Sequence, residues 1–142
     1  MGIVLGFEHE GGLIGTIRIV PMGHGLTLTE ELLPQLGADA PAFGAGDWEV
    51  GRLVVAPGHR SDVETLRACM HRSLVYGCGN ARVTRLYATC THVLSRLYRR
   101  FGFAVFAREV PLRDTGKSYT MISGDARTVA AALGGQVAPR TH

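Results

Sequence analysis

The sequence lacks the features that mark membrane, secreted and metal-binding proteins. Its longest apolar runs are only a few residues, which excludes a transmembrane helix, and no basic stretch with an apolar core follows Met1 as in a signal peptide. The three cysteines, Cys69, Cys78 and Cys90, form no C-x-x-C pair, and the six histidines show no metal-ligand spacing. We therefore expect a cytoplasmic protein with reduced thiols, no metal and no membrane partner.

Lysine is almost absent, because Lys117 is the single lysine among 15 basic residues and arginine carries the net charge of +3. The planar guanidinium group of arginine binds phosphate and carboxylate groups through paired hydrogen bonds. Coding bias in a GC-rich genome is the alternative explanation for this composition. No basic run is interleaved with aromatic residues, so nucleic acid is not an expected partner.

What the sequence does contain is the composition of one compact domain. Hydrophobic residues make up 46% and charged residues 19%, which predicts a single domain over residues 1–142 with a flexible tail over residues 134–142. Periodicity, capping boxes and turn residues predict alternating strands and helices with a loop over residues 37–47. These elements are strands over residues 3–7 and 13–20, a short helix over 27–36, a strand over 48–56, a helix from 61 that ends at Gly77 and Gly79, a strand over 83–88, a helix over 91–101, strands over 103–112 and 118–122, and a helix over 125–133.

The strand WEVGRLVVA is the strongest strand candidate. Its apolar run Leu53, Val54 and Val55 predicts burial on both faces and therefore a central position in a sheet. A turn then leads into a helix that a capping box opens at residues 61–64. The first amides of a helix lack internal partners and carry the positive end of its dipole, which makes this junction a candidate phosphate site. An ordinary strand-to-helix turn is the alternative.

This strand, the junction and the later helix end LYRRFGF together resemble the GNAT acyltransferase superfamily. The resemblance implies an α/β (α+β) fold with a central, mixed and mostly antiparallel sheet flanked by helices. It also implies that Leu53, Val54 and Val55 hold the pantetheine arm of an acyl thioester. The superfamily binds the CoA pyrophosphate with a loop of the pattern R/Q-x-x-G-x-G/A, whose counterpart here is Arg60, Ser61, Asp62 and Val63, with Val63 and Thr65 at the glycine positions.

Within that superfamily, one branch is more similar than the rest. The segments GTIRIVP (residues 15–21) and WEVGRLVV (residues 48–55) resemble the G-x-x-R-x-x-P and W-E-x-S-R-F-x-V strands of the bacterial acyl-homoserine-lactone synthases and N-acyl amino acid synthases. Gly51 and Leu53 replace the serine and phenylalanine of that pattern. The resemblance implies transfer of an acyl group from acyl carrier protein or CoA to a small amine acceptor, with no tightly bound cofactor. A phosphate loop without glycine favours the carrier protein as donor.

The resemblance also assigns roles to single residues. Glu49 corresponds to the general base that takes a proton from the attacking amine, and an ion pair with Arg18 or Arg52 is the alternative. Trp48, Arg18 and Arg52 correspond to substrate-binding residues beside the acyl and acceptor pockets. Tyr98 corresponds to the tyrosine that protonates the departing thiolate, and packing in the core is the alternative.

The helix that ends at LYRRFGF carries three exposed arginines, Arg96, Arg99 and Arg100. A solvated helix end is one interpretation, because cations are favoured near the negative end of a helix. Docking of an acidic carrier protein is the other interpretation, and it predicts a reaction that is sensitive to salt.

The N-terminal strand and helices of the branch, which close over the amine acceptor, have no counterpart in this sequence. We therefore expect a sheet that begins at the superfamily's second strand and a possible homodimer that completes the sheet or the acceptor site. Two further functions remain open. One is an ordinary acetyl-CoA-dependent N-acetyltransferase, and the other is a catalytically degenerate binding or dimerisation module.

Overall fold

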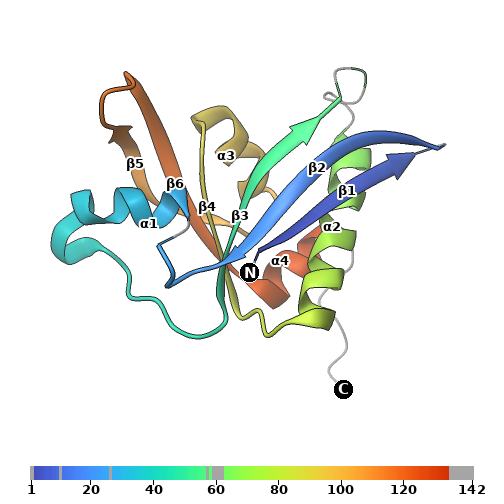
Figure 1. Cartoon of the computed structure of the whole chain (residues 1–142), viewed down its shortest axis with the longest axis horizontal. Coiled ribbons are helices and arrows are strands. Elements are labelled where there is room, and N and C mark those ends of the chain that lie inside the picture. The colour runs from blue at the N-terminus through green and yellow to red at the C-terminus, as the bar shows by residue number, and fades with distance from the viewer. Residues whose placement is uncertain (1, 10, 26, 57, 59–62, 135–142) are drawn as a thin grey trace.

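The computed structural model describes residues 2–9, 11–25, 27–56, 58 and 63–134. In this part of the chain six strands form one sheet in the order β1-β2-β3-β4-β6-β5 (Figure 1). Only β3 and β4 pair in parallel, so the predicted mixed and mostly antiparallel sheet is confirmed. The elements are β1 (Ile3–His9), β2 (Gly12–Pro21), α1 (Leu28–Leu32), the 3₁₀ segment η1 (Leu33–Asp39), β3 (Asp47–Val55), α2 (Val63–Asn80), β4 (Arg85–Cys90), α3 (His92–Arg99), β5 (Ala104–Leu112), β6 (Lys117–Asp125) and α4 (Ala126–Leu133).

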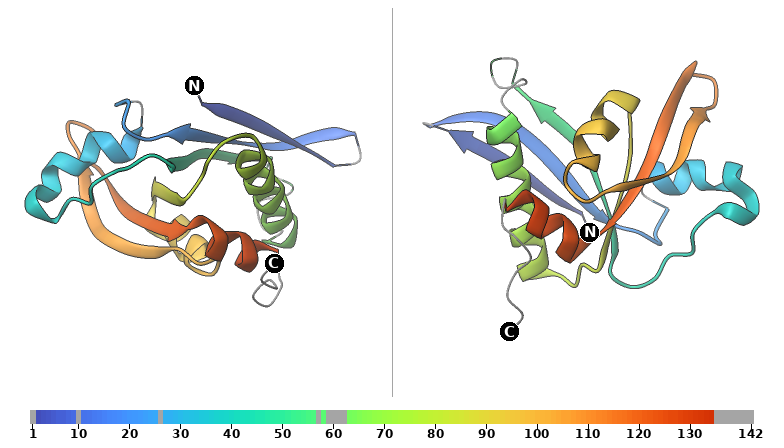
Figure 2. Two further views of the ribbon diagram at one scale, coloured as in Figure 1. Left: turned by 90° about the horizontal axis from the view of Figure 1, so that it is seen from below. Right: turned by 180° about the vertical axis from the view of Figure 1, so that it is seen from behind.

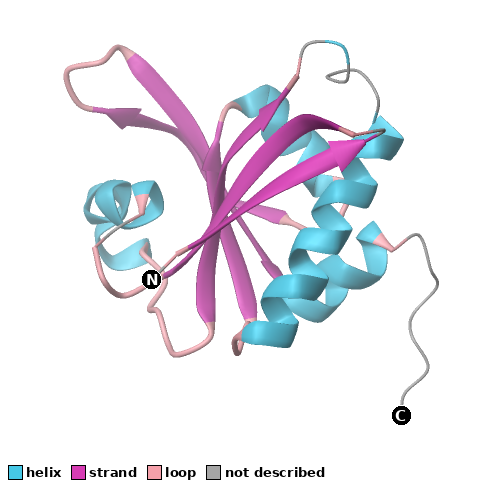
Figure 3. Cartoon of the chain, turned by 45° about the vertical axis from the view of Figure 1, so that its right-hand side comes forward, coloured by secondary structure: helices cyan, strands magenta, loops and turns pink. Residues whose placement is uncertain are grey.

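Helices cover both faces of this sheet. Helices α2, α3 and α4 pack on one face, and α1 with η1 lies on the other (Figures 2 and 3). The larger core cluster fills the three-helix side, where its buried helical members are Leu66, Met70, Leu74, Tyr98, Ala126, Val129 and Leu133. A smaller cluster fills the α1 side with Leu32, Leu33, Val110 and Met121. The short helix α1 is therefore held by its own apolar contacts, close to the middle of the sheet.

Strands β3 and β4 separate after a short contact. Their parallel ladder covers only Asp47–Glu49 on β3, and Figure 1 shows the two strands diverging toward the end of β3. Strand β3 lies between β2 and β4, which confirms the predicted central position. The predicted burial of its apolar end on both faces is wrong, because Val54 is 60% exposed. Once β4 has moved away, this part of β3 has sheet on one side only.

A bulge in β3 lies next to this separation. Between Thr16 and Arg18 of β2, the opposing residues on β3 run from Val54 back to Gly51, so β3 contains one extra residue. Arg52 lies at this point with φ of 52°, a left-handed backbone that residues other than glycine rarely adopt. Bulges of this kind bend a strand and increase its twist.

Several elements end at residues other than those predicted. Helix α2 continues through Gly77 and Gly79 to Asn80, so the prediction that these glycines end it is wrong. Gly77 is buried where α2 faces the sheet, and a Cβ there would be in ordinary van der Waals contact, 3.6 Å from the side chain of Ile19. The segment after α1 stays in 3₁₀ turns to Asp39, with a kink at Gly37, although we expected a loop from residue 37.

The C-terminal ends of β2 and α4 lie at the residues that the sequence predicts. Pro21 is the last residue of β2, as its missing N–H predicts. Gly134 caps α4, and residues 135–142 of the predicted flexible tail lie outside the described residues. Among the helices that the structure describes, none is both long and apolar enough to span a membrane.

Candidate active site

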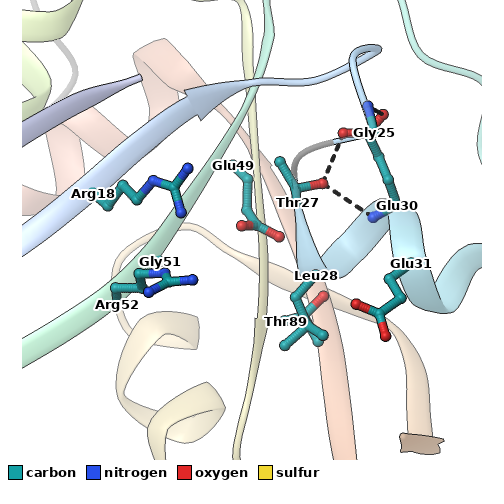
Figure 4. A pocket seen from close by; sticks show the side chains of 10 residues that line it. All are labelled: Arg18, Gly25, Thr27, Leu28, Glu30, Glu31, Glu49, Gly51, Arg52 and Thr89. Carbon is teal, nitrogen blue, oxygen red and sulfur yellow. Dashed lines mark hydrogen bonds between the residues drawn. The ribbon is translucent and has the colours of Figure 1, made fainter. Parts of the chain in front are cut away.

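Three of the residues predicted for the site, Arg18, Glu49 and Arg52, line a single pocket between the sheet and the start of α1 (Figure 4). The pocket has a volume of about 470 Å³. Its other lining residues come from β3, β4, α1 and the segment that leads into α1, and they are Gly51, Thr89, Gly25, Thr27, Leu28, Glu30 and Glu31.

The register of β2 and β3 explains why these side chains meet. Arg18 pairs with Gly51 and Val20 pairs with Glu49, and directly opposed residues project to the same face of a sheet. Arg18 and Glu49 therefore point to the same side. A regular strand would turn Arg52 away from Glu49, because successive side chains alternate between faces. The bulge interrupts this alternation, and both Gly51 and Arg52 line the pocket.

Glu49 is a buried carboxyl group, with only 9% of the residue exposed. Its Oε2 accepts two hydrogen bonds from Thr29, one from the backbone N–H at 2.8 Å and one from the hydroxyl at 2.6 Å. Burial raises the pKa of Glu49, the two Thr29 bonds and Arg18 lower it, and Glu30 raises it. The ion pair considered as an alternative is absent, since neither Arg18 nor Arg52 forms a salt bridge with Glu49 in the described residues.

The first turn of α1 supplies the donor for Glu49. The Thr27 side chain accepts from the N–H of Glu30 at 3.1 Å, so the predicted helix cap is formed. The Glu30 carboxylate accepts from the N–H groups of Gly23 and Gly25 and from the Thr27 hydroxyl. The N–H of Thr29 is one of the first-turn donors that have no partner inside a helix, and here Glu49 accepts its hydrogen bond.

Charge in the pocket is divided between its two sides. Arg18 and Arg52 lie together on the β2 and β3 side, and Glu30 and Glu31 lie on the α1 side with Glu49 between them (Figure 4). A molecule that carries one anionic and one cationic group matches this arrangement. Sequence reasoning did not identify Thr29, Thr89 and Glu31. The contact of Thr29 with Glu49, the contact of Thr89 with Thr29 and the place of Glu31 in the pocket all depend on how α1 packs on the sheet.

Of the residues predicted for catalysis and substrate binding, Tyr98 and Trp48 lie outside this pocket. Tyr98 is 1% exposed in the larger core cluster, its ring lies 5.4 Å from that of Phe103, and burial raises its pKa. Trp48 packs against the same cluster, and its indole Nε1 donates to the carbonyl oxygen of Arg82 at 3.0 Å. Their predicted roles in protonating the thiolate and binding substrate stay predictions.

The residues predicted to bind the thioester and the phosphate come after Arg52 in the sequence, at the end of β3 and the start of α2. Leu53, Val54 and Val55 form the end of β3, beyond its ladder with β4. Val63 is the first residue of α2 and is exposed. Arg60, Ser61 and Asp62, the rest of the predicted phosphate loop, lie outside the described residues.

A second hollow lies at the end of α3. Its volume is about 550 Å³, and it is lined by Arg96, Arg99 and Arg100 together with Arg108 from β5. The rest of its lining is Phe103, Ala104 and Val105. The structure thus adds a fourth arginine to the three that the sequence indicated. We refer to these four side chains as the arginine hollow.

A sheet that opens between two central parallel-paired strands, with a polar pocket at the opening, defines the class as a GNAT-type acyltransferase fold. Solved structures confirm this class. The acyl-homoserine-lactone synthase LasI superposes with a TM-score of 0.70 and 19% identity, covering 98% of this chain and 72% of LasI. BjaI, a CoA-dependent acyl-homoserine-lactone synthase, gives a TM-score of 0.64 and 18% identity, covering 99% and 70%. A GNAT acetyltransferase from Streptococcus pneumoniae gives 0.58 and 11%, covering 87% and 67%.

The sequence comparison is more specific than the fold. The family model described as "N-acyl amino acid synthase FeeM" matches residues 2–125. The chain belongs to the FeeM N-acyl amino acid synthase family, which confirms both the predicted acyltransferase class and the predicted branch. No curated protein sequence matches the chain significantly.

Proposed function

We propose that this protein transfers an acyl group from a pantetheine thioester to the amino group of an amino acid. The observation that carries this proposal is the pocket in which a buried Glu49 lies between two arginines and two further glutamates. The match to a family of N-acyl amino acid synthases supports the same acceptor class.

The division of charge in the pocket matches the two charged groups of an amino acid. The guanidinium groups of Arg18 and Arg52 are suited to bind the carboxylate of an amino acid, which a planar donor fork can hold through paired hydrogen bonds. The ammonium group of the same molecule then lies toward Glu49 and the acidic α1 side. A simple amine without a carboxylate would leave both arginines without an anionic partner.

Glu49 is proposed as the general base. The acceptor must lose a proton before its nitrogen can attack, and a carboxylate whose pKa is raised by burial is a better proton acceptor at neutral pH than an exposed one. Glu49 takes one proton from the ammonium group, and the neutral amine nitrogen then attacks the thioester carbonyl carbon to form a tetrahedral intermediate. The C–S bond then breaks, a second proton from the nitrogen passes to the departing thiolate, and the products are an amide and a free thiol.

The open end of β3 is proposed as the thioester site. Main-chain N–H groups of the segment Leu53–Val55 would hold the carbonyl oxygen and stabilise the oxyanion of the intermediate. The end of the β3–β4 ladder at Glu49 and the exposure of Val54 support this placement, because a pantetheine arm could lie beside the strand. Proton donation by Tyr98 would be revealed by slower thiol release in Tyr98→Phe at unchanged stability.

Acyl carrier protein is proposed as the donor in preference to CoA. The arginine hollow offers four cations to an acidic carrier surface, and the two glycine positions of the phosphate loop hold Val63 and Thr65. BjaI is described as CoA-dependent, so the donor has to be determined for this chain directly. The predicted homodimer at the edge of the sheet is tested by sedimentation of the purified protein.

Thiol release and product mass test the proposed function. The protein is mixed with acyl carrier protein thioesters, long-chain acyl-CoA or acetyl-CoA, each with a panel of amino acids, simple amines and S-adenosylmethionine. We expect release from acyl carrier protein with amino acids, and loss of about 10²-fold or more in Glu49→Gln. Turnover of acetyl-CoA alone would instead show an ordinary acetyltransferase. No turnover with any donor would show a binding module.

The matched control for Glu49→Gln is Glu8→Gln, which changes an exposed glutamate on β1. We expect this control to keep wild-type activity. A Glu49→Gln enzyme that is folded and as active as the wild type contradicts the assignment of the base.

A further inference from the structure

Hydrogen bonds join the carboxyl group of Glu49 on β3 to Thr29 on α1 and, through the Thr29 hydroxyl, to Thr89 on β4. We propose that Thr29 and Thr89 form a hydroxyl relay that positions Glu49, occupying its Oε2 and leaving Oε1 as the atom that receives the substrate proton. Both threonines are positioning residues in this proposal, because they act through Glu49. The inference rests on the proposed function, in which Glu49 is the base.

The geometry at Oε2 is the first support. Thr29 is fully buried at 0% exposure, and both its N–H and its hydroxyl donate to the same carboxyl oxygen, at 2.8 and 2.6 Å. Two donors use the lone pairs that a carboxylate oxygen presents in its plane. A proton from the acceptor amine is therefore directed to the other oxygen.

The surroundings of Oε1 are the second support. Within the described part of the chain Oε1 forms no hydrogen bond. Gly51 leaves space beside it, since a Cβ at that position would lie 3.4 Å from Oε1. Glu49 and Gly51 both line the pocket, so Oε1 is the oxygen that a bound acceptor can reach.

The direction of the relay follows from the number of protons. The Thr29 hydroxyl has one proton, and it uses that proton to donate a hydrogen bond to the ionised carboxyl group of Glu49. The Thr89 oxygen lies 2.7 Å from the Thr29 oxygen, so Thr89 must donate in that contact. Each bond in such a chain polarises the next, and the donation from Thr89 strengthens the bond from Thr29 to Glu49.

The relay also joins elements that are distant in the sequence. Glu49 lies 20 residues from Thr29, and Thr89 lies 60 residues from it, so α1, β3 and β4 are connected through one hydroxyl group. This connection holds the base beside the point where β3 and β4 separate. Because the Glu49 side chain has no ion-pair partner among the described residues, Thr29 is what restricts its position.

The electrostatic consequence has a definite sign. Burial favours the neutral carboxyl group, and hydrogen bonds from Thr29 favour the ionised one. The other charged groups that face Glu49 are Arg18 from β2, Arg52 from β3, and Glu30 and Glu31 from α1. Removal of the Thr29 hydroxyl leaves these charges in place, and it should raise the pKa of Glu49 further.

Isosteric variants test the relay. Thr29→Val removes the hydroxyl, and Thr29→Ser restores it. Thr128→Val, an exposed change on α4 away from the pocket, is the control. We expect Thr29→Val to move the acid limb of the rate profile to higher pH and to lower kcat at least about tenfold below neutral pH, with little change in the KM for the donor. Thr29→Ser should return the profile to that of the wild type.

Titration of the carboxyl group by ¹³C NMR, with labelled glutamate and Glu49→Gln for assignment, decides the relay without any turnover. A higher pKa of Glu49 in Thr29→Val supports it, and an unchanged pKa in a folded variant overturns it. If Thr29→Val does not fold, Thr89→Val must give a smaller shift in the same direction, and no shift there overturns the relay. A wild-type protein with no acyl transfer would instead contradict the proposed function, and the titration would still decide the relay.

Discussion

Glu49 accepts both a backbone and a hydroxyl hydrogen bond from Thr29, and this contact joins the short helix α1 to the central strand of the sheet. A carboxyl group that is buried and held on one oxygen presents its other oxygen in a defined direction. In a GNAT-type fold that opens beside the same residue, this arrangement suits a base that acts on a bound amine.

The stability of the protein should depend on the pH through Glu49. The pKa of Glu49 is raised on folding above its ordinary value of 4.5, so the folded state holds this proton to higher pH than the unfolded state does. Glu49 therefore lowers the free energy of unfolding as the pH rises from the ordinary carboxyl range through the raised pKa. The free energies of unfolding of the wild type and of Glu49→Gln, measured with denaturant, should differ more at pH 7.5 than at pH 4. The Glu49→Gln variant should be the more stable of the two. A constant difference contradicts this.

Gly51 should control how acidic Glu49 is. Gly51→Ser adds a hydroxyl beside Oε1, at a contact distance that the structure tolerates, and its hydrogen bond should lower the pKa of Glu49. The acid limb of the rate profile should then move to lower pH. Gly51→Ala adds the same Cβ without a donor and is the control, which should not lower the pKa. Equal profiles for the two variants would contradict the prediction.

Replacing Arg52 should change both the stability of the protein and the binding of the amino acid. Its φ of 52° suits glycine better, so Arg52→Gly should raise the free energy of unfolding by about 1 kcal/mol. The same variant loses a guanidinium from the acceptor side of the pocket, and the KM for the amino acid should rise about tenfold or more while the KM for the donor is unchanged.

The control for Arg52→Gly is Asp114→Gly. Asp114 also has a positive φ, of 64°, and it does not line the pocket. Asp114→Gly should therefore show the gain in stability with no change in either KM. If the KM for the amino acid changed similarly in both variants, the effect of Arg52→Gly would come from the backbone and not from the lost guanidinium group.

The arginine hollow should distinguish the two donors. Arg99→Glu combined with Arg108→Glu should raise the KM for acyl carrier protein thioesters about tenfold and leave that for acyl-CoA nearly unchanged, because only the carrier has a large acidic surface. Added salt should weaken the wild-type reaction with carrier protein in the same way. Arg127→Glu, an exposed change on α4, is the control. An equal effect on both donors would contradict docking at this surface.

Much of the fold was predictable because its signals are local. Alternation along β2, the cap at Thr27 and the turn residues all act over a few positions, and the order of elements followed from them. The exposure of Val54 was not predictable in this way. An apolar run reports what can be buried, whereas the separation of β4 from β3 decides what is buried.

The candidate site shows the same division. Arg18, Glu49 and Arg52 were found from two strand motifs, and the register of β2 and β3 then places Arg18 and Glu49 on one face. Tyr98 and Trp48 came from the same kind of motif, but the structure places both against the larger core cluster. A motif position does not reveal which face of an element meets the pocket when the packing of neighbouring elements determines it.

The sequence by itself indicated the order of strands and helices through local periodicity, the acyltransferase family through its resemblance in the strand and helix-end motifs, and Arg18, Glu49 and Arg52 as candidate residues of the pocket. Only the tertiary structure decided that Thr29 contacts Glu49, that Thr89 contacts Thr29, and that Arg52 lies at a bulge and lines the same pocket. These relationships join positions 20 and 60 residues apart and depend on where α1 packs. Local propensity cannot encode them, since a hydrogen bond between distant segments forms only after the whole sheet has assembled.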